Sequence, residues 1–150
     1  MSKFLVRFFN VVLAGIMAGI VFGIWLGCDP EKMSFPGYVE YQQGLINAFN
    51  VLMPLLGLVV ILLTLLSAIL QREDKGTFIA LLLAMALLVL SGLITRFGNQ
   101  PINAIVMTWH PDSPPSDWMA LRDKWWSLHI IRTLAIGMSF SLVTGSGLRR

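Results

Sequence analysis

Long apolar runs without Asp, Glu, Lys or Arg dominate the chain and determine its predicted architecture. Such runs cover residues 8–28, 41–71 and 76–95. Each reaches the roughly 20 residues that an α-helix needs to cross about 30 Å of hydrocarbon. The last run, residues 133–148, is shorter, so its helix must begin earlier and bring His129 and Arg132 to the membrane boundary. Only helices and closed barrels satisfy their backbone in lipid, and we therefore expect an all-α membrane protein.

The expected fold is a single four-transmembrane-helix bundle. Its spans cover residues of about 6–28, 44–70, 77–96 and 124–146. Within the second span, Pro54 frees the backbone carbonyl of Asn50, which predicts a kink at that point.

The third loop is predicted to contain a short re-entrant or interfacial helix. Asn99 followed by Pro101 is typical of a helix start, with the asparagine as N-cap and the proline in the first turn. The segment "HPDSPPSD" then breaks the chain. Ser116 or Asp117 is expected to cap the last helix, which outlasts the bilayer.

Composition agrees with a membrane environment. Hydrophobic residues make up 56% of the chain and charged residues only 13%, whereas globular domains carry about 25% charged residues. The net charge of +3 is spread among apolar spans, so we expect a lipid bilayer and no nucleic acid as partner. The single cysteine, Cys28, excludes an internal disulfide. The apolar run before Cys28 is too long for a lipoprotein signal, so we expect a retained helix.

Basic residues give a weak orientation signal. One face would carry both termini, and the other would carry Lys32, Arg96, Arg122, Lys124 and Arg132. The slight excess on the first face predicts that both termini are cytoplasmic in a multi-pass bacterial inner-membrane protein. Because four spans alternate, the first and third loops share a face in either orientation.

The first helix carries a stripe of small residues, Gly15, Gly19, Gly23 and Gly27, at intervals of four. Such a stripe lets another helix backbone approach closely. It predicts tight packing within the bundle or a contact with a partner helix, as in a homo-oligomer. The wall of a substrate cleft is the alternative.

Polar side chains from separate segments are expected to meet near one membrane face. Ionisable groups at membrane depth favour a functional site, although a polar network that only locks the bundle is the alternative. The candidate catalytic residues are His129, Arg132 and Arg96, and the candidate substrate-binding residues are Asn47, Asn50, Asn99, Asn103, Trp109 and Trp125.

These residue types suit a hydrophobic, weakly acidic substrate such as a phenol or enol. We expect His129 to remove a proton and Arg132 or Arg96 to stabilise the resulting anion. No metal and no cofactor are expected. Two alternatives stay open: an iron site of His129, His110 and a carboxylate such as Glu40 or Asp112, and a haem held by His110 and His129.

Several motifs together resemble the anthrone oxygenase-like membrane family. They are "NQPIN" at residues 99–103, "WMALRDKWWSLHIIRT" at 118–133, "QQGLINAFN" at 42–50 and the glycine-rich first helix. The resemblance implies a four-helix membrane protein that oxidises an anthrone to an anthraquinone with O2, without a cofactor, by deprotonation of an activated carbon. It makes Asn99, Pro101, Asn103, Trp125, His129 and Arg132 signature residues. The rival hypothesis is a non-catalytic accessory or structural subunit of a larger membrane complex.

Overall fold

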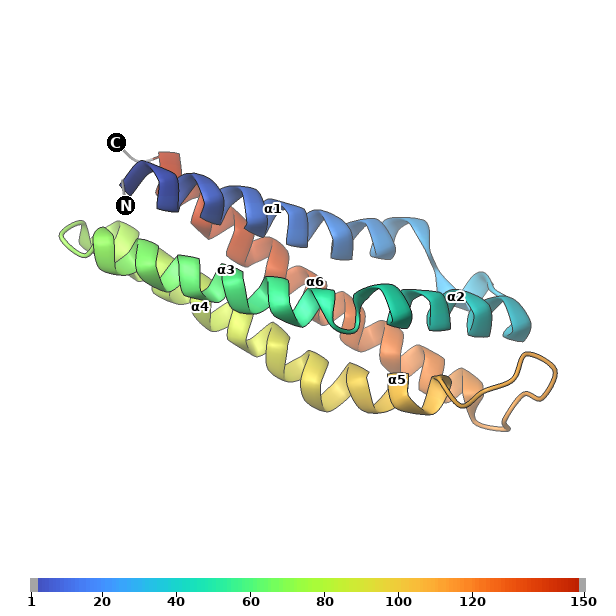
Figure 1. Ribbon diagram of the computed structural model, residues 1–150. Coiled ribbons are helices and arrows are strands. Elements are labelled where there is room, and N and C mark those ends of the chain that lie inside the picture. The colour runs from blue at the N-terminus through green and yellow to red at the C-terminus, as the bar shows by residue number, and fades with distance from the viewer. Residues whose placement is uncertain (1–2, 149–150) are drawn as a thin grey trace.

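The computed structural model describes residues 3–148 as a bundle of helices (Figure 1). Four of its helical segments are long and apolar enough to cross a membrane. This confirms the predicted all-α membrane fold. In chain order the elements are α1 (Lys3–Gly27), the 3-10 helix η1 (Pro30–Lys32), α2 (Phe35–Phe49), α3 (Leu52–Leu70), α4 (Lys75–Ile94), the π-helix η2 (Thr95–Asn99), α5 (Gln100–Val106) and α6 (Trp118–Leu148).

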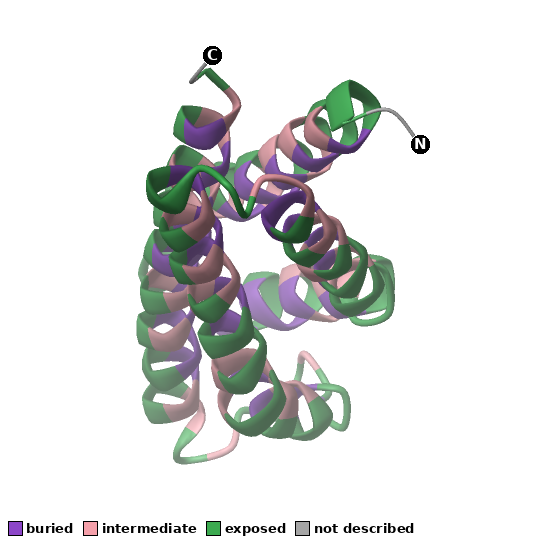
Figure 2. Ribbon diagram, turned by 90° about the vertical axis from the view of Figure 1, so that its left-hand side faces the viewer, coloured by how far each residue is buried: buried purple, intermediate pink, exposed green. Residues whose placement is uncertain are grey.

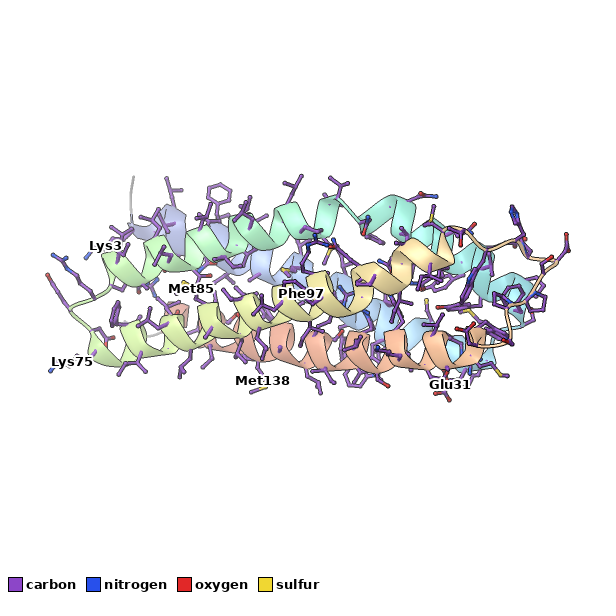
Figure 3. The ribbon with its side chains drawn as sticks, turned by 90° about the horizontal axis from the view of Figure 1, so that it is seen from below. Lys3, Glu31, Lys75, Met85, Phe97 and Met138 are labelled. Atoms are coloured by element: carbon purple, nitrogen blue, oxygen red, sulfur yellow. The ribbon has the colours of Figure 1, made fainter. Side chains whose placement is uncertain are left out.

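The two ends of the bundle differ in character. The described ends of α1 and α6 lie beside the turn between α3 and α4, while η1, α2 and the loop 107–117 lie at the opposite end (Figure 1). Lys3 and Lys75 mark the first end and Glu31 marks the second (Figure 3). The first and third loops therefore share a face, as the alternation of spans predicted.

The predicted second span is two helices, and its predicted start at residue 44 is wrong. The first of them, α2, begins at Phe35, where the Ser34 hydroxyl accepts a hydrogen bond from the Gly37 N–H at 3.4 Å and a proline occupies the first turn. It ends at Phe49, and the chain turns at Asn50 before α3 begins. Pro54 cannot donate to the Asn50 carbonyl, so the expected kink becomes a complete break.

The third loop also differs from the prediction. The expected short helix is present as α5, but it continues α4 through η2 to form one stretch from Lys75 to Val106. In η2 the Gln100 N–H donates to the Thr95 carbonyl, five residues back. Asn99 makes no side-chain capping bond, so its predicted role as an N-cap is wrong. The Asn99 side chain instead donates to a backbone carbonyl of α6, as described below.

The longest helix, α6, is the centre of the bundle and packs against both α4 and α1. Buried faces of the helices point at one another, as the purple segments in Figure 2 show. Glycine permits a close approach at Gly98, where an added Cβ would lie 2.8 Å from the Leu128 Cδ1 atom. Gly15 packs on the Phe140 ring, whereas Gly19, Gly23 and Gly27 are exposed with no neighbouring atom within 4 Å of an added Cβ. The partner-helix contact of that stripe stays a prediction.

Candidate functional site

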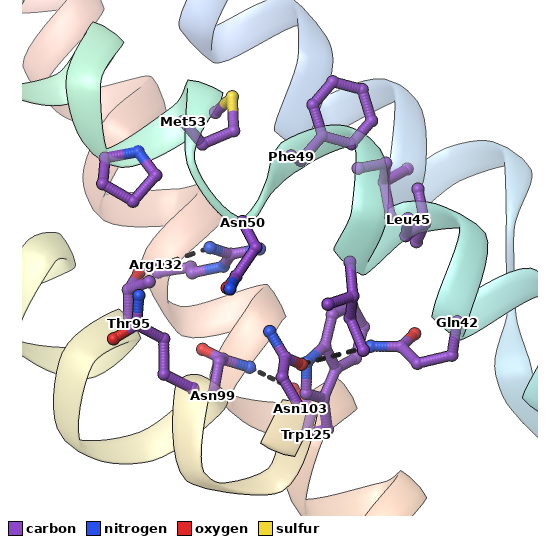
Figure 4. Close-up of a pocket in the computed structure, with 14 residues that line it drawn as sticks. Gln42, Leu45, Phe49, Asn50, Met53, Thr95, Asn99, Asn103, Trp125 and Arg132 are labelled. Carbon is purple, nitrogen blue, oxygen red and sulfur yellow. Dashed lines mark hydrogen bonds between the residues drawn. The ribbon is translucent and has the colours of Figure 1, made fainter. Parts of the chain in front are cut away.

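A polar pocket lies where α2, η2, α5 and α6 meet (Figure 4). It has a volume of about 50 Å³, and its lining combines amides and Arg132 with apolar side chains such as Leu45 and Phe49. It adjoins a larger, mostly apolar pocket of about 230 Å³ between α1, α3, α4 and α6. The two pockets share the lining residues Met53, Pro54, Thr95, Gln100 and Arg132. We call them the polar arm and the apolar arm of one cavity.

Arg132 stands at the junction of the two arms. Its Nη1 donates to the Thr95 hydroxyl at 3.3 Å, and its Nη2 donates to the Nδ1 atom of His129 at 3.0 Å. The Nε atom is buried with no hydrogen-bond partner. Within residues 3–148, no carboxylate forms an ion pair with this guanidinium. The site therefore presents a cation that the described protein atoms do not neutralise.

His129 accepts a hydrogen bond from Arg132 and is itself held by neighbouring rings. The side chain is fully buried, and the ring lies parallel to the indoles of Trp125 and Trp126, with centroids 5.2 and 5.4 Å away. Its Nε2 is 3.1 Å from the Val21 carbonyl, and this bond requires a proton on Nε2. Nδ1 is then the acceptor for Arg132, so both ring nitrogens are engaged. His129 lines neither arm of the cavity.

A network of amides forms the rest of the polar arm. The Asn99 Nδ2 donates to the Trp125 carbonyl at 3.1 Å, and the Trp125 indole N–H donates to the Asn103 Oδ1 at 2.8 Å. Gln42 Nε2 reaches the same Asn103 oxygen at 3.5 Å. These bonds join residues of α2, η2, α5 and α6 (Figure 4). The arrangement leaves the Asn99 Oδ1 and Gln42 Oε1 atoms buried without partners. The residues that line this arm thus carry both a buried unpaired donor, the Arg132 Nε, and buried unpaired acceptors.

The structure brings together many of the predicted site residues. Asn50, Asn99, Asn103, Trp125 and Arg132 line the polar arm. Arg96 lines the apolar arm, is exposed, and donates to the Gln100 Oε1 at 3.3 Å.

Two predicted substrate-binding residues lie away from the cavity. Asn47 is exposed on the other side of α2. Trp109 is buried in an aromatic cluster with Phe35 and Tyr38, because its ring packs against both. Neither residue lines the polar or the apolar arm.

Gln42 and Thr95 are site residues that the sequence reasoning missed. Gln42 shares the buried face of α2 with Phe35, Tyr38 and Ile46. A helix start at the Ser34 N-cap, with the proline in the first turn, would have predicted this buried face. Thr95 carried no signal of its own, since a threonine near a helix end is common.

The aromatic cluster closes the loop end of the site. Trp118 packs on Phe35 and Tyr38 with ring centroids 5.1 and 6.0 Å away, and the Arg122 guanidinium lies over the Trp118 ring. Burial raises the pKa of the Tyr38 hydroxyl, so it stays neutral. Among the described residues, no three His, Cys, Asp or Glu side chains form a group that could hold a metal ion.

Comparison with known families decides the relationship. The family model described as anthrone oxygenase matches residues 44–142. The chain belongs to the anthrone oxygenase family. The matched segment of this anthrone oxygenase family member contains Asn50, the π-helix and the bonds of Arg132 to Thr95 and His129, but it begins after Val21 and Gln42. No curated protein and no solved structure matches the chain.

Proposed function

We propose that this family member binds a lipid-soluble phenol or enol in the two-armed cavity and oxidises it with O2. Arg132 is the observation that carries the proposal. A guanidinium remains protonated in proteins, and within a span it is costly unless it meets an acceptor. Since the described residues supply no carboxylate partner, a bound enolate or phenolate oxygen supplies the missing negative charge.

The shape of the cavity agrees with this substrate class. The apolar arm, lined by side chains such as Met17, Ile61 and Ile136, accommodates the hydrocarbon body of the substrate. The polar arm places acceptors on Asn99 and Gln42 where hydroxyl groups of the substrate can donate. A substrate with an apolar ring system and an acidic edge fits both arms at once.

The reaction balances without an additional reductant. An anthrone and O2 give an anthraquinone and water. The methylene carbon first loses a proton to give an enolate, whose oxygen is stabilised by Arg132. The electron pair of the carbanion then forms a C–O bond to O2, and the resulting hydroperoxide anion takes up a proton. Loss of water from the hydroperoxide forms the new carbonyl, so protons are neither consumed nor released overall.

The described lining of the cavity contains no carboxylate and no imidazole that could accept the first proton. We therefore propose that water accepts it, since the enolate is stabilised once Arg132 is in place. In this account His129 is a positioning residue for Arg132 and replaces the base expected from the sequence. Its Nδ1 fixes the guanidinium, and its two flanking indoles fix the imidazole.

The direct assay is conversion of emodin anthrone by the protein in nanodiscs, followed by quinone absorbance and O2 uptake. Replacement of Arg132 by glutamine should lower the catalysed rate by about 100- to 1,000-fold, the usual loss for one oxyanion stabiliser. The matched control is Arg72→Gln, at the exposed turn between α3 and α4, which should leave the rate unchanged. A wild-type rate equal to the spontaneous rate would contradict the enzyme role and favour the non-catalytic subunit.

A further inference from the structure

The apolar arm of the cavity opens sideways, between α3 and α4. These helices diverge from their common turn towards the end of the bundle where the arm lies (Figure 1). The arm is lined by Leu58 of α3 and Gly92 of α4, and both residues are exposed on the outer surface of the bundle. We call the opening bounded by Leu58 and Gly92 the window.

The window lies at the depth of the lipid hydrocarbon. Gly92 is 17 residues after Lys75, about 25 Å along the helix at 1.5 Å per residue. Leu58 is 12 residues before the end of α3, about 18 Å along that helix. Both positions fall within a hydrocarbon layer of about 30 Å that starts at the α3–α4 turn. A molecule passing through the window would come from lipid.

Side-chain contacts hold the aromatic cluster and α2 together at the water-facing end of the cavity. Rings of the aromatic cluster pack together there, and α2 is held in place by Gln43, whose Nε2 donates to the carbonyls of Val106 and Trp109 at 3.0 Å each. The cluster rings of Phe35 and Trp118 are in edge-to-face contact. Asn50 lines the polar arm and is exposed, so a route from water past Asn50 is the alternative that the test below distinguishes.

We propose that the substrate of this site is taken from the bilayer through the window and reaches Arg132 by sliding along the apolar arm. Gly92 is suited to the rim, because no atom lies within 4 Å of an added Cβ and its missing side chain leaves the opening wide. Arg96, one turn further along, lines the same arm and is exposed. The inference rests on the binding part of the proposed function and does not depend on turnover.

Binding kinetics test the route directly. The probe is 1,8-dihydroxyanthraquinone, which is not consumed by O2, added to protein in nanodiscs and followed by stopped-flow quenching of tryptophan fluorescence. Gly92→Phe narrows the window, and Leu58→Phe narrows it from the facing rim. The matched control is Gly145→Phe. Gly145 is also exposed, with no atom within 4 Å of an added Cβ, but it lies near the C-terminal end of α6 and lines neither arm.

For either window variant, association and dissociation should both slow by about tenfold, with the Kd unchanged within about threefold, as expected for an obstructed route to an intact site. The control should bind like the wild type. Varying the amount of lipid should make the wild-type association rate follow the mole fraction of probe in the lipid.

Unchanged rates in both window variants, or a rate that follows the free aqueous probe, would overturn the lateral route and leave the proposed function intact. Absence of probe binding to the wild type would overturn the proposed function together with this inference.

Discussion

The decisive residue is Arg132, because a charged side chain within a span is destabilising by about 2.5–3.5 kcal/mol even on scales that allow relaxation. The protein offers it a hydroxyl and an imidazole but, within the described residues, no carboxylate. A purely structural network would be expected to neutralise the charge. An anionic ligand explains why the charge is left open and why it faces a cavity.

Variants of His129 separate a positioning role from a base. Asparagine can still accept a hydrogen bond from Arg132, whereas leucine cannot. His129→Asn should therefore retain much of the activity, and His129→Leu should lose about 10- to 100-fold in kcat, as expected for about 1–3 kcal/mol from an unsatisfied buried donor. Equal, complete loss in both variants of the emodin anthrone assay would instead identify the imidazole as the base.

At the residue scale, the sequence predicted most of the residues that line the polar arm, while their chemistry stays a prediction. Asn50, Asn99, Asn103, Trp125 and Arg132 line the polar arm as expected. The remaining predicted residues depended on which helix face points inward, and that is set by where a helix begins. The predicted start of the second span was too late in the chain. As a result, Asn47 was predicted as a site residue in place of Gln42.

At the element scale, the π-helix η2 is what joins the third span to the site. Gly98 lets η2 approach α6 closely enough for the Asn99 amide to reach the Trp125 carbonyl. The sequence predicted a polar segment after residue 95, but it did not predict that this segment continues α4 as one helical stretch. A proline in the first turn of α5 suggested a new helix, but a π turn already leaves backbone groups unpaired locally and tolerates the proline.

Enlarging Gly98 should push η2 away from α6. Gly98→Val should destabilise the protein by about 1–3 kcal/mol through overpacking against Leu128, and should weaken quinone binding as the Asn99 bond is lost. The comparison variant is Gly137→Val, where an added Cβ meets nothing within 4 Å. Thermal unfolding and probe affinity measure the two effects. The double variant Gly98→Val/Leu128→Ala should recover part of both, and no recovery would contradict the packing explanation.

At the scale of the whole molecule, the site sits near one membrane surface. Arg132 is 16 residues before Leu148, about 24 Å along α6, which places it inside the hydrocarbon near its far boundary. The polar arm and α2 then lie at headgroup level, while the apolar arm reaches into lipid. This depth suits a substrate that partitions into membranes and carries an acidic edge.

The predicted orientation places the site at the face opposite the cytoplasm. In a Cys28→Ser background, Asp112→Cys should react with an impermeant maleimide on intact cells, whereas Glu73→Cys should react only after permeabilisation. Both positions are exposed carboxylates in the structure, at opposite ends of the bundle. The reverse labelling pattern would show that both termini lie outside.

Stabilisation of an anion by Arg132 is measured directly by a visible titration of bound 1,8-dihydroxyanthraquinone. A neighbouring cation lowers the pKa of an acid by about 1–3 units, so the bound phenol should ionise at a pH at least about one unit lower in the wild type than in Arg132→Gln. Binding of the probe by both proteins with the same ionisation midpoint would contradict the central claim.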